Sequence, residues 1–524
     1  MKDFYSNVKK EILEFEHYKA IIYAIVISGI LSHGSFLFHK IAFHDEVYAM
    51  FGTGMSITGG RWTSFLLGKF WADLFGDGLY SLTIINSLIA FICVGVSVGI
   101  VSKLYNITSD FIIFVLTSIM ISTPAMTSML GYTFSVANMM IGILCAVMGA
   151  CLICISYANK EIVFACCGSF LIACAIGVYQ AWIGMGCAIV LGKWILRLSN
   201  FEEKYTWKEF FREGLFYLFF LILALVEYLL CNKFFLAITH CELSEYQGIS
   251  DYGTGNIVEY VQRIKKIFLD FIIPEQSDAS LYTGILKWVY IFTLILVLIN
   301  FIFVIKSIYL ANLKRVWMLL LAIFFIPIGQ NLITVIVDTE KTHLWALSYY
   351  SKLSYFLLLA GFINVKLSIN EKGYILRQKV NKLVSISLVF LLICNIRYDN
   401  ICYMYADMMQ AHTKSYMQTL ATKIQNIEGY EKDMPVIYIN EFEKEAYDNA
   451  FEKEFDDEYI VAPYGVDWIN NYAWKQFVSF WCGYEPEVLD FKDSGIRQTV
   501  IDEMPNYPND GSIRIIDDKI IVKF

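Results

Sequence analysis

Apolar runs recur along most of the chain, and they limit what it can fold into more than any other feature. Between Lys19 and Asn395 these runs hold roughly 18 to 25 nearly uncharged residues each, enough for a helix to cross the core of a bilayer. Hydrophobic residues make up 57% of the 524 residues and charged residues 17%, a balance unlike that of a soluble domain. The sequence therefore predicts a multi-pass membrane protein and excludes a soluble enzyme.

The runs predict about eleven membrane-spanning helices and an α-helical polytopic fold. The fifth and sixth helices come from one long run, which we divide at Gly177-Val178-Tyr179-Gln180 because polar residues appear there. An odd number of spans places the two ends of the chain on opposite sides of the membrane. Lys and Arg concentrate in the segments that lie inside when the N-terminus is inside. The predicted spans are 20–38, 80–101, 111–128, 134–157, 161–177, 181–196, 214–238, 285–306, 314–336, 353–368 and 383–398.

Charge divides the chain into two parts. Residues 1–398 hold 30 Lys and Arg against 25 Asp and Glu, a net of +5, whereas residues 399–524 hold 11 against 24, a net of −13. We therefore expect a polytopic transmembrane catalytic domain over 1–398 and a small acidic α/β domain over 399–524, on the extracytoplasmic side. The acidic charge argues against a nucleic-acid partner, because phosphate binding needs the opposite sign.

The acidic part has its own pattern of secondary structure. We expect a polar helix through Gln425, a strand at 435–439, a helix near 467–481 and a terminal pair of strands at 512–516 and 519–523. Asp517-Asp518 is the predicted turn between the last two strands.

Polar residues concentrate outside the predicted spans. The first outer loop, Lys40 to Leu79, holds His44-Asp45-Glu46 and Gly59-Gly60-Arg61-Trp62, and Trp62 to Phe75 reads as a helix in the membrane interface. A coupled transporter usually keeps ionisable residues in mid-span, whereas here Glu227 is the main exception. This distribution favours an enzyme that acts at the outer interface.

Asp45 and Glu46 are the candidate catalytic residues. Neighbouring residues do not share one face of a helix or strand, so we expect one carboxylate to be the general base. The other would bind a sugar hydroxyl, help to hold a cation or cap the following helix. The alternative is that both only cap that helix.

Several motifs resemble one family. His44-Asp45-Glu46, then Gly60-Arg61-Trp62, then Gly177-Val178-Tyr179-Gln180-Ala181, and a tail with Met504-Pro505-Asn506-Tyr507-Pro508 and Gly511-Ser512-Ile513 resemble the bacterial membrane glucosyltransferases that decorate O-antigen. The resemblance implies a GT-C type fold, a polyprenyl-phosphate sugar donor and inverting transfer on the extracytoplasmic side. The chain departs from the family in its long acidic tail and in having Asp-Glu where some relatives show Asp-Asp.

Transfer from a lipid phosphate also needs a cation for the leaving phosphate. Arg61 is the first candidate because a guanidinium matches phosphate oxygens in a fork, and Lys69, His343 and Lys352 are further candidates. The alternatives are headgroup contacts for Arg61 and Lys69 and a plain surface role for His343. The candidates for binding the sugar or the acceptor are His44, Trp62, Tyr179, Gln180 and Asn331. The alternative for Tyr179 and Gln180 is a turn between two helices, and the alternative for Asn331 is a hydrogen bond to a neighbouring helix.

These features together predict a hexosyltransferase in the bacterial cytoplasmic membrane. It would move a hexose from a polyprenyl-phosphate donor to a cell-envelope glycan at the outer face, and the family resemblance implies that the hexose is glucose. The alternative is a flippase or transporter of lipid-linked sugars. We expect no cofactor and no divalent metal, because no compact set of hard-cation ligands accompanies Asp45 and Glu46.

Overall fold

The computed structural model describes residues 17–52, 57–76, 80–200, 205–244, 255–272, 284–336, 350–352, 354–367, 369–440 and 473–524. They form two compact units. The first contains the chain up to His39 and from Phe51 to Asn400, and the second contains Lys40–Met50 and Ile401–Phe524.

Long apolar helices dominate the first unit. Within the described residues, eight helices have the length and composition to cross a membrane, or nine when one bent pair is counted as a span. They are α2 (Tyr18–Phe38), α5 (Thr83–Leu104), α8 (Thr133–Asn159), α10 (Ile183–Ser199, with the 3-10 turn η3 at Gln180–Trp182), α11 (Trp207–Thr239), α13 (Gly284–Ala311), α14 (Leu313–Gln330) and α18 (Glu371–Gln425). These helices are those of a polytopic membrane protein, while the count of eleven and the inner N-terminus stay predictions.

Three predicted spans differ in form from single long helices. The span at 111–128 is the bent pair, α6 (Asp110–Ile121) and α7 (Pro124–Leu130), which meet at 46°. Thr123 precedes Pro124 and has ψ of 143°, the extended conformation that a following proline favours. The span at 314–336 consists of α14 and the short α15 (Leu332–Ile336), and that at 353–368 contains α17 (Ser354–Asn364).

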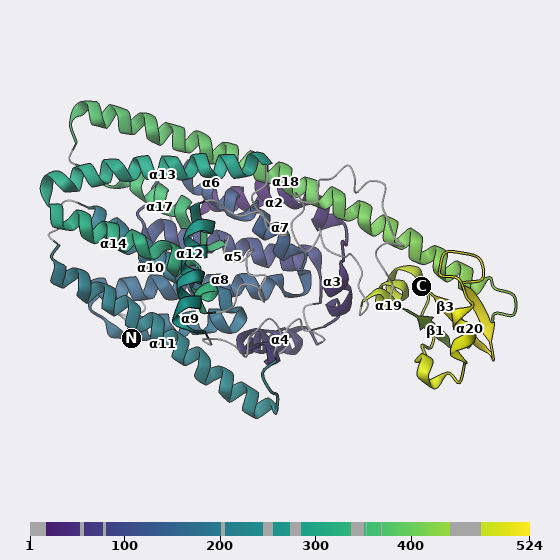
Figure 1. The fold of residues 1–524 in the computed structure, drawn as a ribbon. Helices are drawn as coiled ribbons and strands as arrows, with labels where there is room; N and C mark the ends of the chain where they lie inside the picture. The colour runs from purple at the N-terminus through teal and green to yellow at the C-terminus, as the bar shows by residue number, and fades with distance from the viewer. Residues whose placement is uncertain are drawn as a thin grey trace. The chain divides into compact units, whose positions relative to one another are not determined.

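The helices of the first unit pack closely side by side (Figure 1). One close crossing joins α8 to α9 (Ile162–Val178), where a Cβ on Gly149 or on Gly168 would lie 2.6 Å from the carbonyl oxygen of the other glycine. Outward-facing residues such as Leu215 and Leu218 of α11 are apolar and more than half exposed, which suits a surface covered by lipid. Small residues thus join the helices and large apolar ones face the bilayer.

Two shorter helices accompany the long ones, and the second of them is strongly amphipathic. The stretch predicted as an interfacial helix is α4 (Trp62–Phe75), which packs against α9 and α11. The second, α12 (Ile257–Ile272), runs across α14 and also contacts α15 (Figure 1).

The second unit contains a three-stranded sheet. Its strands are β1 (Val436–Ile439), β2 (Ile513–Ile516) and β3 (Lys519–Lys523) in the order β1-β3-β2, with β1 parallel and β2 antiparallel to β3. The hairpin between β2 and β3 turns at Asp517 and Asp518, as predicted, and both residues have positive φ, as a tight hairpin turn requires. Of the helix predicted near 467–481, only the part from residue 473 onward is described, and it contains α19 (Trp474–Phe477).

The sheet packs on a small apolar cluster of Ile501, Met504 and Ile521, of which Ile501 belongs to α20 (Gln498–Asp502). Residues 401–425 of α18 and the short α3 (His44–Ala49) complete this unit. An extracytoplasmic position for residues 399–524 stays a prediction.

Candidate functional site

A glycine turn in front of α4 is held by two side chains that are distant in the sequence. Gly60 has φ of +70°, in the left-handed region that favours glycine. The Gln180 amide donates to the Gly59 carbonyl oxygen over 2.8 Å, and the Tyr228 hydroxyl donates to that of Gly60 over 3.1 Å. The same Gln180 nitrogen lies 3.3 Å from the Tyr228 hydroxyl oxygen. The turn is therefore fixed to η3 on one side and to α11 on the other.

Arg61 follows this turn and stacks on an aromatic ring. Its guanidinium carbon lies 4.5 Å from the centre of the Tyr179 ring, a cation–π contact. Tyr179 is buried where α9 ends, whereas Arg61 is partly exposed. Stacking uses the face of the guanidinium, and a phosphate is bound by the N–H edge. The arrangement thus orients a cation whose chemistry suits an anionic group.

Trp62 anchors the start of α4. Its ring stacks on Phe235 with 5.5 Å between the ring centres. A Cβ on Gly177 would lie 2.5 Å from the Thr63 hydroxyl oxygen and 2.7 Å from the Trp62 ring, so the glycine permits close contact between α9 and α4. The structure therefore brings together four residues that the sequence singled out in two separate motifs, namely Arg61, Trp62, Tyr179 and Gln180.

The remaining predicted binding residues of the first unit have other contacts or lie outside the described residues. Lys69 is exposed on α4, with its ammonium 4.6 Å from the centre of the Phe65 ring. The Asn331 amide donates to the Pro327 carbonyl oxygen over 3.0 Å, which is a bond within the end of α14. Lys352 is buried, and His343 lies outside the described residues.

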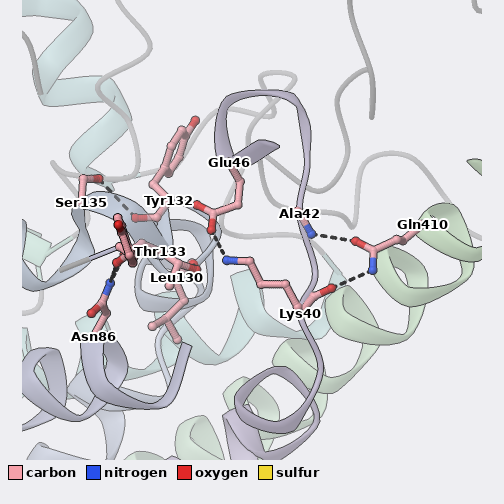
Figure 2. Close-up of polar contacts among 10 residues, drawn as sticks. Lys40, Ala42, Glu46, Asn86, Leu130, Tyr132, Thr133, Ser135 and Gln410 are labelled. Carbon is pink, nitrogen blue, oxygen red and sulfur yellow. Dashed lines mark hydrogen bonds and ion pairs between the residues drawn. The ribbon is translucent and has the colours of Figure 1, made fainter. Parts of the chain in front are cut away.

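His44, Asp45 and Glu46 open α3 in the second unit. Glu46 is fully buried and forms an ion pair with Lys40 (Figure 2). Gln410 of α18 holds the segment by its backbone, because its amide donates to the Lys40 carbonyl oxygen over 2.7 Å and accepts from the Ala42 N–H over 2.7 Å (Figure 2). This clamp ties the motif to the helical part of the second unit.

Asp45 has a different partner and different exposure. Its carboxylate lies 2.9 Å from His44 Nδ1, and 35% of its side chain is exposed. Phe43 is the N-cap residue of α3, and no side chain caps that end by a hydrogen bond. The two carboxylates sit in the first turn without acting as the cap residue, and each contacts a separate basic side chain.

Sequence reasoning overlooked two buried acids. Asp399 of α18 is fully buried and accepts from the Thr127 hydroxyl over 2.5 Å. It escaped notice because it falls one residue beyond the predicted span. Glu213 of α11 is also fully buried and accepts from the hydroxyls of Tyr205 and Tyr217 and from Arg197, 3.3 Å away. The available signal for both was an acid directly beside the end of a predicted span, since Asp399 follows 383–398 and Glu213 precedes 214–238.

The described residues contain no group of three or more His, Cys, Asp or Glu side chains placed to hold a metal ion.

Comparison with protein families identifies the chain. The model of the family described as Glucosyl transferase GtrII matches residues 34–359, well over half of the sequence. Neither the curated proteins nor the solved structures contain a match. The matched range includes α3, the turn before Arg61 and the Tyr179-Gln180 pair, so the chain belongs to the GtrII family of glucosyl transferases and is a glycosyltransferase.

Proposed function

We propose that this glycosyltransferase moves glucose from a polyprenyl-phosphate donor to a cell-envelope glycan at the outer face of the bacterial cytoplasmic membrane. The observation that carries the proposal is the stacked pair of Arg61 and Tyr179 at the start of α4. A cation oriented at the end of an amphipathic helix suits a phosphate whose lipid tail stays in the bilayer. A nucleotide sugar would not need a site embedded among apolar helices.

Arg61 takes the role of neutralising the phosphate as it leaves the sugar. Negative charge grows on the phosphate oxygens when the bond to the sugar breaks, and a fixed guanidinium stabilises that charge more in the transition state than in the ground state. Gln180 and Tyr228 support this role because they fix the backbone of the preceding turn. Lys69, His343 and Lys352 remain secondary candidates for the same task.

Asp45 takes the role of general base. A base must reach the acceptor hydroxyl, and Asp45 is partly exposed whereas Glu46 is buried against Lys40. His44, which contacts the Asp45 carboxylate, would orient it. Glu46 then acts as a positioning residue, because its ion pair with Lys40 fixes the first turn of α3.

The choice of sugar donor tests this proposal. The purified full-length protein in nanodiscs is incubated with an envelope glycan fraction and one of three donors: polyprenyl-phosphate glucose, polyprenyl-phosphate galactose or UDP-glucose. We expect transfer from the first, much less from the second and none from the third. Transfer from UDP-glucose without lipid phosphate would refute the proposed donor. In liposomes, movement of the lipid across the bilayer without cleavage of the sugar–phosphate bond would support a flippase instead.

A further inference from the structure

A polar cavity lies at the opposite end of α10 from the Arg61 turn. Its volume is about 600 Å³, within the range of small-ligand sites. It is bounded by the C-terminal ends of α5, α8, α10 and α17. Because Lys193, the first residue of α10 in its wall, follows Trp182 of η3 by 11 residues and a helix rises about 1.5 Å per residue, the cavity and η3 lie about 16 Å apart along the helix. The cavity is therefore separate from the candidate site described above.

Its walls carry cations and amides. Lys193, Arg197 and Lys366 line it together with Asn106, Asn200 and Asn364, and none of the described residues that line it is acidic. This composition is the reverse of the acidic balance of the whole chain, whose net charge is −8. A cavity lined by several cationic side chains is suited to binding an anion.

Fixed contacts hold these walls in place. The Lys193 ammonium donates to the Leu104 carbonyl oxygen over 2.7 Å, and the Asn364 amide donates to that of Asn106 over 2.8 Å. Arg197 is oriented by Glu213, 3.3 Å away, and by the ring of Tyr157, 5.3 Å from its guanidinium carbon. Lys193 and Arg197 are thus positioned before any ligand arrives.

The simplest alternative is that the cations only neutralise the carbonyl ends of the helices. Another side chain already does this for α10, since Arg315 donates to the carbonyl oxygens of Arg197, Leu198 and Asn200. Arg315 does not line the cavity. Lys193 does the same for the end of α5 through Leu104, and Arg197 is paired with Glu213. Together with Lys366, these side chains still give the wall a net positive charge.

We propose that this cavity binds a phosphate group, carried either by an anionic phospholipid or by free phosphate. Cationic pockets between membrane helices suit anionic headgroups because the phosphate binds the cations while the acyl chains stay among the helices. The predicted topology places this end of α10 inside, where such lipids concentrate. The proposal does not depend on the sugar donor, because the two sites lie at opposite ends of the same helix.

Thermal unfolding of the full-length protein tests the proposal. It is measured in nanodiscs of phosphatidylcholine alone, in nanodiscs with phosphatidylglycerol, and in phosphatidylcholine with inorganic phosphate added. We expect the unfolding temperature to rise in one of the last two conditions, because a ligand that binds only the folded state stabilises it. A rise with phosphatidylglycerol alone identifies the lipid headgroup, and a rise with phosphate alone identifies the free anion.

Two variants make the test specific. Lys193→Gln with Lys366→Gln should abolish the rise, whereas Lys314→Gln with Lys379→Gln removes the same charge from exposed positions outside the cavity lining and should keep it. If the first pair fails to fold, Lys366→Gln alone should weaken ligand binding about tenfold, since each 1.4 kcal/mol of lost binding energy is a factor of ten. An equal rise in unfolding temperature in both double variants, or no rise in the unmodified protein, would overturn the proposal.

Discussion

The Tyr228 hydroxyl donates a hydrogen bond to the Gly60 carbonyl oxygen over 3.1 Å and so ties the turn before Arg61 to α11. The two residues are 168 positions apart. Because Arg61 follows Gly60 directly, the position of its guanidinium depends on this bond and on the contact of Gly59 with Gln180. The turn, rather than Arg61 alone, is therefore the unit whose disturbance should affect transfer.

Gly60→Ala should damage both stability and turnover. A Cβ there would lie 2.7 Å from the Tyr228 hydroxyl oxygen and 3.0 Å from the Gln180 amide nitrogen, and φ of +70° is strained for alanine. We expect a loss of about 1 to 3 kcal/mol in the free energy of unfolding. Thermal unfolding and turnover per folded molecule measure the two effects. Gly59→Ala is the control, because the atoms nearest to its Cβ would be those of the Arg61 side chain at 3.7 Å, an ordinary van der Waals contact. Equal damage in both variants would contradict the role of the Gly60 turn.

Arg61→Lys should weaken donor use without affecting folding. Lysine keeps the charge and loses the fork that binds phosphate oxygens. A hydrogen bond to a charged group contributes about 1.5–3 kcal/mol, so kcat/KM for the donor should fall by about tenfold or more. Arg212→Lys, at an exposed position on α11, is the matched control. An unchanged kcat/KM in the Arg61 variant would remove this residue from the phosphate contact.

Asp45→Asn and Glu46→Gln should differ in what they lose. Loss of the base in the first variant should lower turnover by a factor on the order of 10² to 10⁴ with little change in unfolding temperature. The second should lower the unfolding temperature, because it weakens a buried ion pair with Lys40. Its turnover per folded molecule should stay within about tenfold of normal. The reverse pattern would make Glu46 the base, and near-normal turnover in both variants would exclude α3 from the chemistry.

Glu213→Gln should destabilise the first unit. The carboxylate accepts from two tyrosine hydroxyls and pairs with Arg197, which keeps 33% of its side chain exposed. Removing one partner of a buried pair costs about 3–5 kcal/mol, and the exposure of Arg197 lowers the expected loss to about 2–3 kcal/mol of unfolding free energy. Glu209→Gln, in the exposed capping box of the same helix, should cost less. Similar losses in the two variants would argue against the buried network.

The positions of the apolar helices could be predicted from the sequence because apolarity is a local property. The span predicted at 134–157 is α8, Thr133–Asn159, and the division placed at 177–180 is where α9 ends and η3 begins. The bend between α6 and α7 was missed although Pro124 supplies a signal for it. Uniform hydropathy concealed the change of direction.

The contacts of the candidate site could be predicted only in part. Residue type singled out Arg61 and Gln180, but Tyr228 lies within an apolar run, and nothing in its own surroundings indicates the partner across the bundle. The ion pair of Glu46 with Lys40 also depends on how the chain turns between them. Contacts of this kind follow from three-dimensional packing, which one sequence does not reveal.

The crossing of Gly149 and Gly168 also has a consequence for how this chain can evolve. A side chain at either position would clash with the backbone carbonyl oxygen of the other glycine. Every amino acid has this oxygen, so a second substitution at the partner position cannot relieve the clash. Neither glycine can therefore be replaced first and compensated later by its partner. We therefore expect both positions to stay glycine while other positions of α8 and α9 vary.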